Sequence, residues 1–309
     1  MTNTNNTRHY SAYRGELGKY FNLQSGKIFL DLTLGDGGHT EEALIAGCKV
    51  ISFDIDQESI NRSISFLKNI AKPIVIDSDD QRNNLENFRW IIFKTNFVNA
   101  KKTLVQHEIG NVDNIMIDLG PSQNQVLTED RGFSFNSTAM LDMRIDPALS
   151  VTAKDLINVL NEGELRQLFE LADESYAKPI ARVIATLRKE KPITTCSQLS
   201  EIIVRIKGKK TIGIHPATKV FMALRMAVNS ERENIKEIIN QIPDLLNKDG
   251  IAGVISFHSG EDKVVKECFK KLIEEKKVFA INKKPITPNA EELAVSNRTR
   301  SAKLRLIKK

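Results

Sequence analysis

The sequence predicts an α/β protein in which a parallel, doubly wound sheet is interrupted by an inserted helical domain. Between residues 28 and 120, short apolar runs alternate with helical patterns, which is typical of parallel strands joined by crossover helices. Residues 128–213 contain helical patterns and no convincing buried strand, and strand-like runs return near residue 250. We therefore expect a core formed by residues 1–127 and 214–309, with residues 128–213 as the insertion.

Four strands are expected in the first part of the core. The run at 111–120 contains the consecutive apolar residues Ile115, Met116 and Ile117, and we expect it to be a central parallel strand that is buried on both faces. Residues 57–70 carry apolar side chains three and four apart, which indicates an amphipathic helix, and residues 76–89 form a polar loop or short helix. The expected strands are 28–33, 50–55, 90–97 and 111–120, and the expected helices are 15–23, 41–47 and 57–70.

The inserted domain is expected to contain three helices separated by polar breaks, and two further helices follow it. The sheet then resumes with one buried strand and ends with two strands that we expect to be antiparallel. The expected helices are 155–172, 176–190, 195–210, 216–229 and 231–246, and the expected strands are 250–257, 277–282 and 302–308.

Composition and charge limit the class of protein. With 309 residues, of which 41% are hydrophobic and 27% charged, the chain is typical of a globular protein of about two domains. No apolar run approaches the roughly 20 residues of a bilayer span, and the polar N-terminus lacks a secretory signal. The three cysteines lie far apart, so neither a disulfide framework nor a zinc site is indicated. We expect a cytoplasmic protein, and the net charge of +6 mildly favours a polyanionic partner.

The segment DLTLGDGGHT, residues 31–40, predicts a ligand site. Its glycines, Gly35, Gly37 and Gly38, allow the backbone to approach a ligand between a strand and a helix. Asp54 ends the next strand, where a carboxylate can accept hydrogen bonds from both hydroxyls of an adenosine ribose. This pattern fits a nicotinamide cofactor and S-adenosylmethionine equally well, and a purely structural turn is an alternative.

Two later strand ends favour methyl transfer to an amine. Phe97 follows the third strand, where it either stacks on adenine or packs in the core. Asp118 ends the fourth strand within IDLGPS, and a buried acid is costly there unless it is paired or functional. The exocyclic amine of a base is a poor nucleophile because its lone pair is delocalised into the ring, so hydrogen-bond acceptors must localise that pair. We therefore expect Asp118 to be catalytic.

Ten short motifs occur in order along nearly the whole chain, from residue 9 to residue 309. They are DLTLGDGGHT, FDID, IDLGPS, DRGFSF, LDMRIDP, KPIARVI, IHPATKVFMALRMAVNSE, VISFHSGEDK, KKPITP and NRTRSAKLR. This series resembles the RsmH (MraW) methyltransferases. The resemblance implies a Rossmann-like S-adenosylmethionine-dependent methyltransferase core with an inserted helical substrate-binding domain. It also implies methylation of N4 of a cytidine in the decoding region of 16S ribosomal RNA, with 16S ribosomal RNA or the small ribosomal subunit as the partner.

The resemblance further implies which residues bind S-adenosylmethionine. It adds two residues that the patterns alone do not single out, His39 and Gln125, and His39 has the alternative role of capping the following helix. No metal site is implied. The implied cofactor-binding residues are Gly37, Gly38, His39, Asp54, Phe97, Asp118 and Gln125.

The chain departs from the family pattern in several motifs. DLGPSQNQV replaces the usual DLGVSSPQLD around Gln125, and HYSA replaces the usual HxPV at His9. SFHSGED has a glycine in place of a leucine, and Lys219 stands where the family has arginine. A lysine cannot make the bidentate phosphate contact that an arginine makes.

Other polar residues each have two interpretations. His215 and His258 show no metal-ligand spacing, and His258 either borders the target base or holds its loop in place. Arg131, Asp142 and Arg144 either contact the substrate or form a salt-bridge network. The candidates for phosphate contacts are three basic clusters: Lys207, Lys209 and Lys210; Lys283 and Lys284; and Arg298, Arg300 and Arg305.

Alternative functions stay open. A chain that keeps the fold and binds RNA and cofactor without catalysis would be a ribosome-assembly factor, and another RNA or DNA amino-methyltransferase would use the same site. A nicotinamide-dependent oxidoreductase would share the glycine loop but is disfavoured by IDLGPS. The sequence does not distinguish a monomer from a homodimer.

Overall fold

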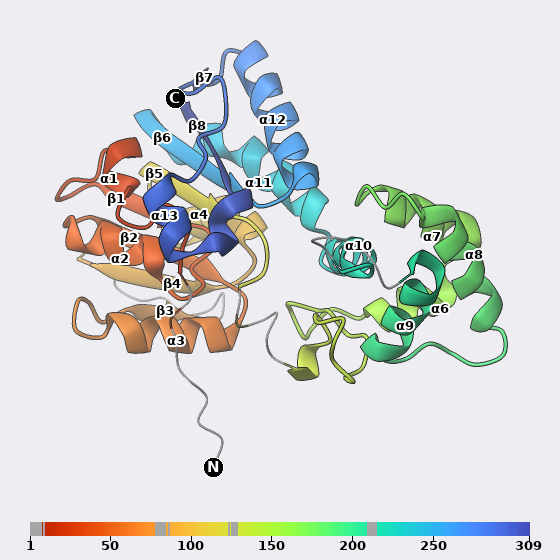
Figure 1. The fold of residues 1–309 in the computed structure, drawn as a ribbon. Coiled ribbons are helices and arrows are strands. Elements are labelled where there is room, and N and C mark those ends of the chain that lie inside the picture. Colours follow the sequence, from red (N-terminus) through yellow and green to blue (C-terminus); the bar gives the residue numbers. More distant parts are fainter. Residues whose placement is uncertain are drawn as a thin grey trace. The chain divides into compact units, whose positions relative to one another are not determined.

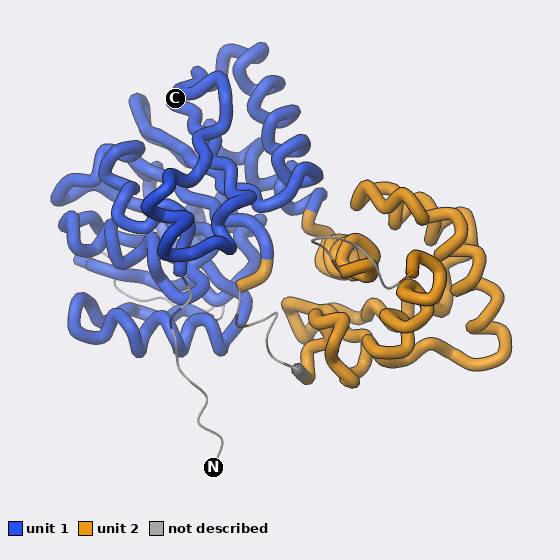
Figure 2. The backbone as a smooth tube through the Cα atoms, viewed as in Figure 1, with its two compact units in different colours: residues 1–120, 232–309 blue, residues 121–231 orange. Residues whose placement is uncertain are grey.

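The chain forms two compact units, which Figure 2 shows in different colours. Unit 1 contains residues 1–120 and 232–309, and unit 2 contains residues 121–231. The computed structural model describes residues 8, 10–77, 85, 87–122, 124, 129–208 and 215–309.

The boundaries of the insertion differ from the expected ones. It begins after residue 120 instead of residue 127, and it ends at residue 231 instead of residue 213. The second difference arises from helix α10 (Thr218–Val228), which we expected in the core. Its side chains Val220 and Leu224 are fully buried in the hydrophobic cluster of unit 2.

In the described residues, unit 1 is built around a sheet of eight strands in the order β3-β4-β2-β1-β5-β6-β8-β7 (Figure 1). The strands from β3 to β6 run parallel, whereas β8 is antiparallel to both β6 and β7, as expected. Because β1 pairs with β2 on one side and β5 on the other, the strand order reverses at β1, and a ligand crevice is expected at the carboxyl ends there. The strands are β1 (Ile28–Asp31), β2 (Lys49–Asp54), β3 (Ile74–Ile76), β4 (Trp90–Lys94), β5 (Val112–Asp118), β6 (Leu246–Ser256), β7 (Phe279–Ala280) and β8 (Lys303–Lys308).

Helices cover both faces of this sheet. Successive strand residues point to opposite faces, so Phe29 packs in one hydrophobic cluster with α1, α2 and α3, while Leu30 packs in another with α4, α11 and α12. The predicted doubly wound α/β core is therefore confirmed. The helices of unit 1 are α1 (Leu17–Tyr20), α2 (Gly38–Ile45), α3 (Gln57–Leu67), α4 (Ala100–Gln106), α11 (Glu231–Leu245), α12 (Ser259–Glu274) and α13 (Ala290–Val295).

Strand β3 and helices α4, α12 and α13 were not expected from the sequence. Strand β3 has only three residues, too few to show an alternating pattern. Helix α4 follows directly on a 3₁₀ turn, η1 (Phe97–Asn99), which begins where the side chain of Asn96 accepts a hydrogen bond from the backbone N–H of Val98. The expected strand 90–97 therefore ends at Lys94, and a helical segment begins at Phe97.

Unit 2 is a helical domain with its own hydrophobic cluster. The segment 155–172 was expected to be one helix but forms two. Asn161 caps the second of them, because its side chain accepts from the N–H of Glu164 while Glu164 accepts from the N–H of Asn161. The other helices of unit 2 are close to those expected. Besides α10, its helices are α6 (Ala153–Val159), α7 (Glu162–Glu170), α8 (Ala177–Leu187) and α9 (Cys196–Lys207).

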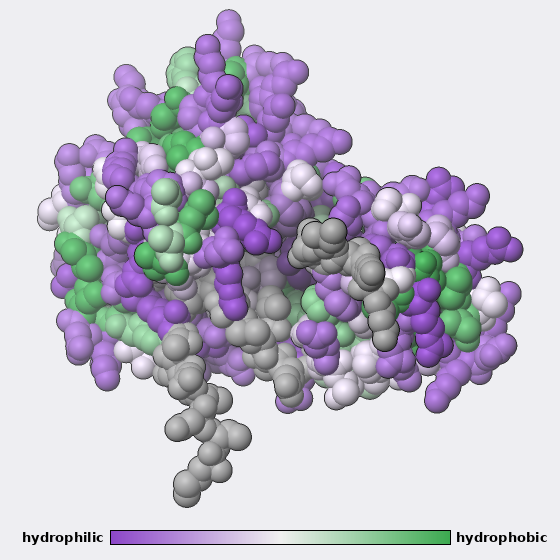
Figure 3. Space-filling view, viewed as in Figure 1, coloured by the Kyte–Doolittle hydropathy of each residue, from purple (hydrophilic) through white to green (hydrophobic). Residues whose placement is uncertain are grey.

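Hydrophilic side chains cover most of the surface that Figure 3 shows on each unit. Within the ranges that the structure describes, no helix combines the length and the apolar composition that crossing a membrane requires.

Candidate functional site

The glycine loop after β1 is attached to the end of β2. The backbone N–H of Gly35 donates to Oδ2 of Asp54 at 2.9 Å, and the N–H of Asp56 donates to Oδ1 at 2.9 Å. Burial raises the pKa of Asp54 to about 7, although these two hydrogen bonds oppose the shift. A carboxylate offers about four lone-pair sites, so Asp54 can accept further hydrogen bonds from a ligand.

The N-terminal segment covers the start of α2. Gly37 has a φ of 78°, in the left-handed region that favours glycine, and it caps the helix. A Cβ on Gly38 would overlap the hydroxyl of the buried Ser11. Arg8 donates to the backbone oxygen of Gly37 at 2.9 Å and pairs with Glu41 at 2.6 Å. The turn therefore favours glycine at position 37, and close packing against Ser11 favours it at position 38.

His39, in helix α2, lies close to the end of β5. The imidazole is 3% exposed, and its Nε2 lies 3.5 Å from Oδ2 of Asp118. The backbone N–H of Asp118 donates to Oγ1 of Thr33 at 2.7 Å, which joins this strand end to the glycine loop. Among the described residues, neither ring nitrogen of His39 nor Oδ1 of Asp118 has a hydrogen-bond partner. His39 does not cap α2.

Asp31, at the end of β1, was missed by the sequence analysis. It is fully buried, and it accepts hydrogen bonds from Oγ1 of Thr40 at 2.7 Å and from the N–H of Thr33 at 3.2 Å. Burial raises the pKa of Asp31, whereas His39 opposes that shift. The rule that singled out Asp118, an acid at the end of a buried strand, would have identified Asp31 as well.

The two remaining predicted cofactor residues are less well defined by the structure. Phe97 opens η1 and is partly buried, and it packs against one hydrophobic cluster of the sheet, which leaves both of its interpretations open. Gln125 lies outside the described residues. The structure thus joins Asp54 to the glycine loop and brings His39 close to Asp118, at one edge of the sheet.

Helix α13 is also connected to the N-terminal segment, which no sequence pattern indicated. Glu292 is 6% exposed, and its Oε1 accepts a hydrogen bond from the N–H of Tyr13 at 2.7 Å. The hydroxyl of Tyr13 donates to the backbone oxygen of Ile286 at 2.7 Å. Burial and the neighbouring Glu292 raise the pKa of Tyr13. Tyr13 therefore joins the segment that precedes α1 to the segment from Ile286 to Glu292.

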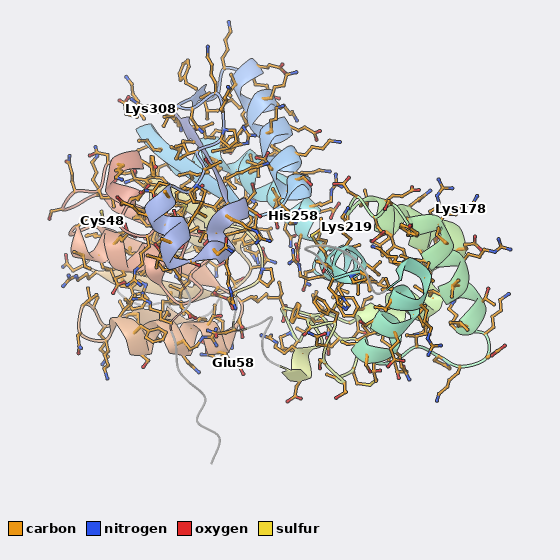
Figure 4. The ribbon with its side chains drawn as sticks, viewed as in Figure 1. Cys48, Glu58, Lys178, Lys219, His258 and Lys308 are labelled. Carbon is orange, nitrogen blue, oxygen red and sulfur yellow. The ribbon has the colours of Figure 1, made fainter. Side chains whose placement is uncertain are left out.

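His258, labelled in Figure 4, begins helix α12. Its Nδ1 accepts a hydrogen bond from the N–H of Glu261 at 3.3 Å, and its Nε2 lies 2.9 Å from Oε1 of Glu261. These contacts favour the interpretation that His258 holds its loop in place. Asp262 forms an ion pair with Arg305 at 2.7 Å. Arg305, which was predicted to contact phosphate, therefore already has a carboxylate partner. In the described part of the chain, no group of histidine, cysteine, aspartate or glutamate side chains could hold a metal ion.

Charged candidates in unit 2 contact their own unit. Arg144 donates to both carboxylate oxygens of Asp142, at 2.7 and 2.8 Å, and Arg131 donates to the backbone oxygen of Ile145. This favours the salt-bridge interpretation. Lys219, which Figure 4 labels on α10, donates to the backbone oxygen of Asp173 at 2.6 Å.

The basic clusters differ in whether their side chains form ion pairs within the protein. Lys207 pairs with the buried Glu174 at 2.6 Å, and His215 stacks on Phe135 with ring centroids 4.1 Å apart. Lys209 and Lys210 lie outside the described residues. Within the three predicted basic clusters, the described side chains that are exposed and form no ion pair with a described residue are Lys283, Lys284, Arg298 and Arg300.

The chain is similar to known proteins in sequence over nearly its whole length. The sequence profile described as the MraW methylase family matches residues 6–309. The chain is 37% identical to Ribosomal RNA small subunit methyltransferase H of Pseudothermotoga lettingae, over 96% of this chain and 97% of the relative. It is 36% identical to the protein of the same name from Sulfurihydrogenibium sp., over 96% of this chain and 98% of the relative. Among solved structures, an rRNA methylase from Streptococcus thermophilus is similar with a TM-score of 0.39 and 11% identity, over 95% of this chain and 91% of that one.

Proposed function

Because the chain belongs to the MraW methylase family, we propose that it methylates N4 of a cytidine in the decoding region of small-subunit ribosomal RNA. The methyl donor is S-adenosylmethionine. Two relatives at 37% and 36% identity are named Ribosomal RNA small subunit methyltransferase H, which supports ribosomal RNA of the small subunit as the substrate. We place this reaction in the cytoplasm, where ribosomal subunits are assembled.

The observation that carries the proposal is the position of Asp118. It ends β5 beside the glycine loop, and its Oδ1 has no hydrogen-bond partner among the described residues. A carboxylate oxygen without a partner costs free energy unless a ligand satisfies it. The amine of a cytosine base carries N–H groups that can donate such a hydrogen bond.

The residues at the strand ends fit S-adenosylmethionine. Asp54 already accepts hydrogen bonds from two backbone N–H groups. Its remaining lone pairs can accept hydrogen bonds from the two ribose hydroxyls. Gly37 and Gly38 belong to the proposed set because the family resemblance implies them, although a Cβ on either would meet protein atoms, those of Leu67 and of Ser11. Phe97 can stack on adenine. His39, Asp118 and Gln125 complete the proposed set.

The chemistry requires orientation and a proton acceptor. When bound, S-adenosylmethionine supplies a methyl carbon whose bond to sulfur breaks with both electrons going to sulfur as the amine nitrogen bonds to the carbon. Asp118 accepts a hydrogen bond from the amine, which localises the nitrogen lone pair, and then takes up the proton that the amine loses. The base must leave its stack to reach this site.

Unit 2 and the exposed basic residues of unit 1 are proposed to hold the RNA. Lys283, Lys284, Arg298 and Arg300 are exposed without an ion-pair partner in the described residues, so they can neutralise phosphates. RNA bases in single-stranded regions are recognised after they are unstacked, which fits a target in the decoding region.

The decisive experiment uses small ribosomal subunits and naked 16S ribosomal RNA from a strain that lacks the gene. Each is incubated with the purified protein and S-adenosylmethionine, and the nucleosides are analysed by mass spectrometry against N4-methylcytidine and C5-methylcytidine standards. New N4-methylcytidine is expected. RNA binding without any methylated nucleoside would instead mark the protein as an assembly factor.

A further inference from the structure

His39, at the start of helix α2, is a buried polar side chain. It is 3% exposed, and neither Nδ1 nor Nε2 has a hydrogen-bond partner among the described residues. Buried polar groups in folded proteins are nearly always paired, so an unpaired imidazole calls for an explanation. Helix capping does not provide one, because the N-cap residue of α2 is Gly37.

Carboxylates surround this imidazole. Nε2 lies 3.5 Å from Oδ2 of Asp118 at the end of β5, and the buried Asp31 at the end of β1 also interacts with the ring. Glu42 of α2 and Glu292 of α13 add negative charge from two other directions. Burial opposes the charged form of His39, but these carboxylates outweigh it and raise the pKa of the imidazole.

The two neighbouring aspartates differ in the hydrogen-bond partners of their carboxylate oxygens. Asp31 accepts hydrogen bonds from Thr33 and Thr40, one on each oxygen. Asp118 has an oxygen without any partner among the described residues, Oδ1, while its Oδ2 is the atom nearest to His39. A separation of 3.5 Å exceeds an ordinary hydrogen bond, and such contacts in ligand-free sites commonly shorten when the substrate is bound.

We infer that His39 is a positioning residue for Asp118: its imidazolium holds Oδ2 of the carboxylate, so that Oδ1 is left for the target amine. This inference rests on the proposed function. In this inference His39 orients the residue that accepts the proton of the amine. The family resemblance implied only that His39 contacts the cofactor. In the step itself, the amine gives one proton to Oδ1 of Asp118, and His39 keeps its own proton throughout.

The pairing can be measured in the ligand-free protein, without any activity. The titration of His39 is followed by NMR of the labelled imidazole, which the variant His39→Gln identifies among the five histidines. Asp118→Asn is expected to lower the pKa of His39 by about one unit or more, because an opposite charge within roughly 4–6 Å shifts a pKa by one to three units. Asp113→Asn, at the opposite edge of the sheet, is the matched control and is expected to leave the titration unchanged. An unchanged titration in Asp118→Asn would overturn the inference.

Kinetics test the consequence for catalysis. His39→Gln keeps a hydrogen-bond donor but has no positive charge. At saturating S-adenosylmethionine it is expected to lose about 10- to 100-fold in kcat. The loss should be largest at low pH, where the wild-type imidazole is charged, because its pKa is raised. His107→Gln, at the far end of α4 from this cluster, is the control and should retain kcat. A folded His39→Gln protein with the kcat and pH profile of the wild type would overturn the inference.

Two further results separate this inference from the proposed function. If His39→Gln loses cofactor affinity and its kcat falls equally at every pH, His39 is a cofactor contact and not a positioning residue. If the wild-type protein methylates no cytidine, the proposed function fails, while the NMR titration still decides whether His39 and Asp118 are paired.

Discussion

The carboxylate of Asp54 accepts a hydrogen bond from the backbone N–H of Gly35 at 2.9 Å, so the end of β2 fixes the conformation of the glycine loop after β1. Its other oxygen binds the N–H of Asp56. One side chain therefore shapes the loop and also presents the acceptor that we assign to the cofactor ribose. Changes at Asp54 should therefore affect cofactor binding both through the ribose contact and through the loop.

Asp54→Asn is expected to weaken S-adenosylmethionine binding by about ten- to a hundredfold. A hydrogen bond to a charged group contributes about 1.5–3 kcal/mol, and the asparagine has one acceptor oxygen where the carboxylate has two. Calorimetric titration of the purified variant measures the change.

Asp113→Asn is the matched control for that measurement. Asp113 lies near the amino end of β5, at the opposite edge of the sheet, and it likewise accepts a backbone N–H, that of Ile28, at 2.9 Å. Its substitution should leave cofactor affinity unchanged. An equal loss in both variants would show that the effect comes from general destabilisation of the sheet.

Cofactor affinity is expected to depend on pH through Asp54. Burial raises the pKa of this carboxyl from 3.8 to about 7, and the ribose hydroxyls would bind the ionised form. Affinity should therefore increase from about pH 6 to about pH 8, with proton release on binding near neutral pH. Because the folded-state pKa is raised, Asp54 contributes the opposite trend to folding: the ligand-free protein loses stability as the pH rises from about 4 to about 7. Calorimetry in buffers of different ionisation enthalpy detects the protons, and Asp54→Asn should abolish the dependence.

Much of the core could be predicted because parallel strands have a strong pattern. The strand that ends at Asp118 has three consecutive apolar residues, Ile115, Met116 and Ile117, on its two faces, which predicted its central place in the sheet. Helix α10 was assigned to the wrong unit. The sequence shows that this helix has an apolar face, with residues such as Val220 and Leu224, but it does not show which hydrophobic cluster that face joins. Asn161 divides a predicted helix in two, and only its pairing with Glu164 reveals the break.

The candidate site was predictable where a residue type fits a strand end, as for Asp54 and Asp118. Contacts between distant segments were not. Ser11 packs on Gly38, and Tyr13 donates its backbone N–H to Glu292, although these pairs are far apart in the sequence. The proximity of His39 to Asp118 also depends on how α2 packs against the sheet.

Gly38→Ala is expected to destabilise the protein by about 1–3 kcal/mol, because the new Cβ would overlap the hydroxyl of Ser11 and force a local shift. Adding Ser11→Gly removes the obstructing atoms, so the double variant should recover most of the loss. Urea unfolding of the two single variants and the double variant measures the coupling. Gly18→Ala is the control, since its Cβ would meet no atom within 4 Å. Additive effects of the two substitutions would contradict the packing that we describe.

Arg298 and Arg300 are expected to bind the phosphates of the RNA. Thr299 between them is 2% exposed and donates to the backbone oxygen of Ser296 at 2.9 Å, so the 3₁₀ turn η3 (Asn297–Ser301) is fixed to the protein while both arginines are exposed. By contrast, Arg305 is held by Asp262.

The double variant Arg298→Ala/Arg300→Ala should weaken RNA binding and reduce the slope of log affinity against log salt by about one for each phosphate that the protein no longer neutralises. Its affinity for S-adenosylmethionine should not change, because neither arginine belongs to the proposed cofactor set. Lys72→Ala provides the control, since this exposed lysine precedes β3 at the amino-terminal edge of the parallel strands, opposite the site. Equal salt slopes for the double variant and the wild type would exclude these arginines from the RNA interface and leave Lys283, Lys284 and unit 2 to hold the substrate.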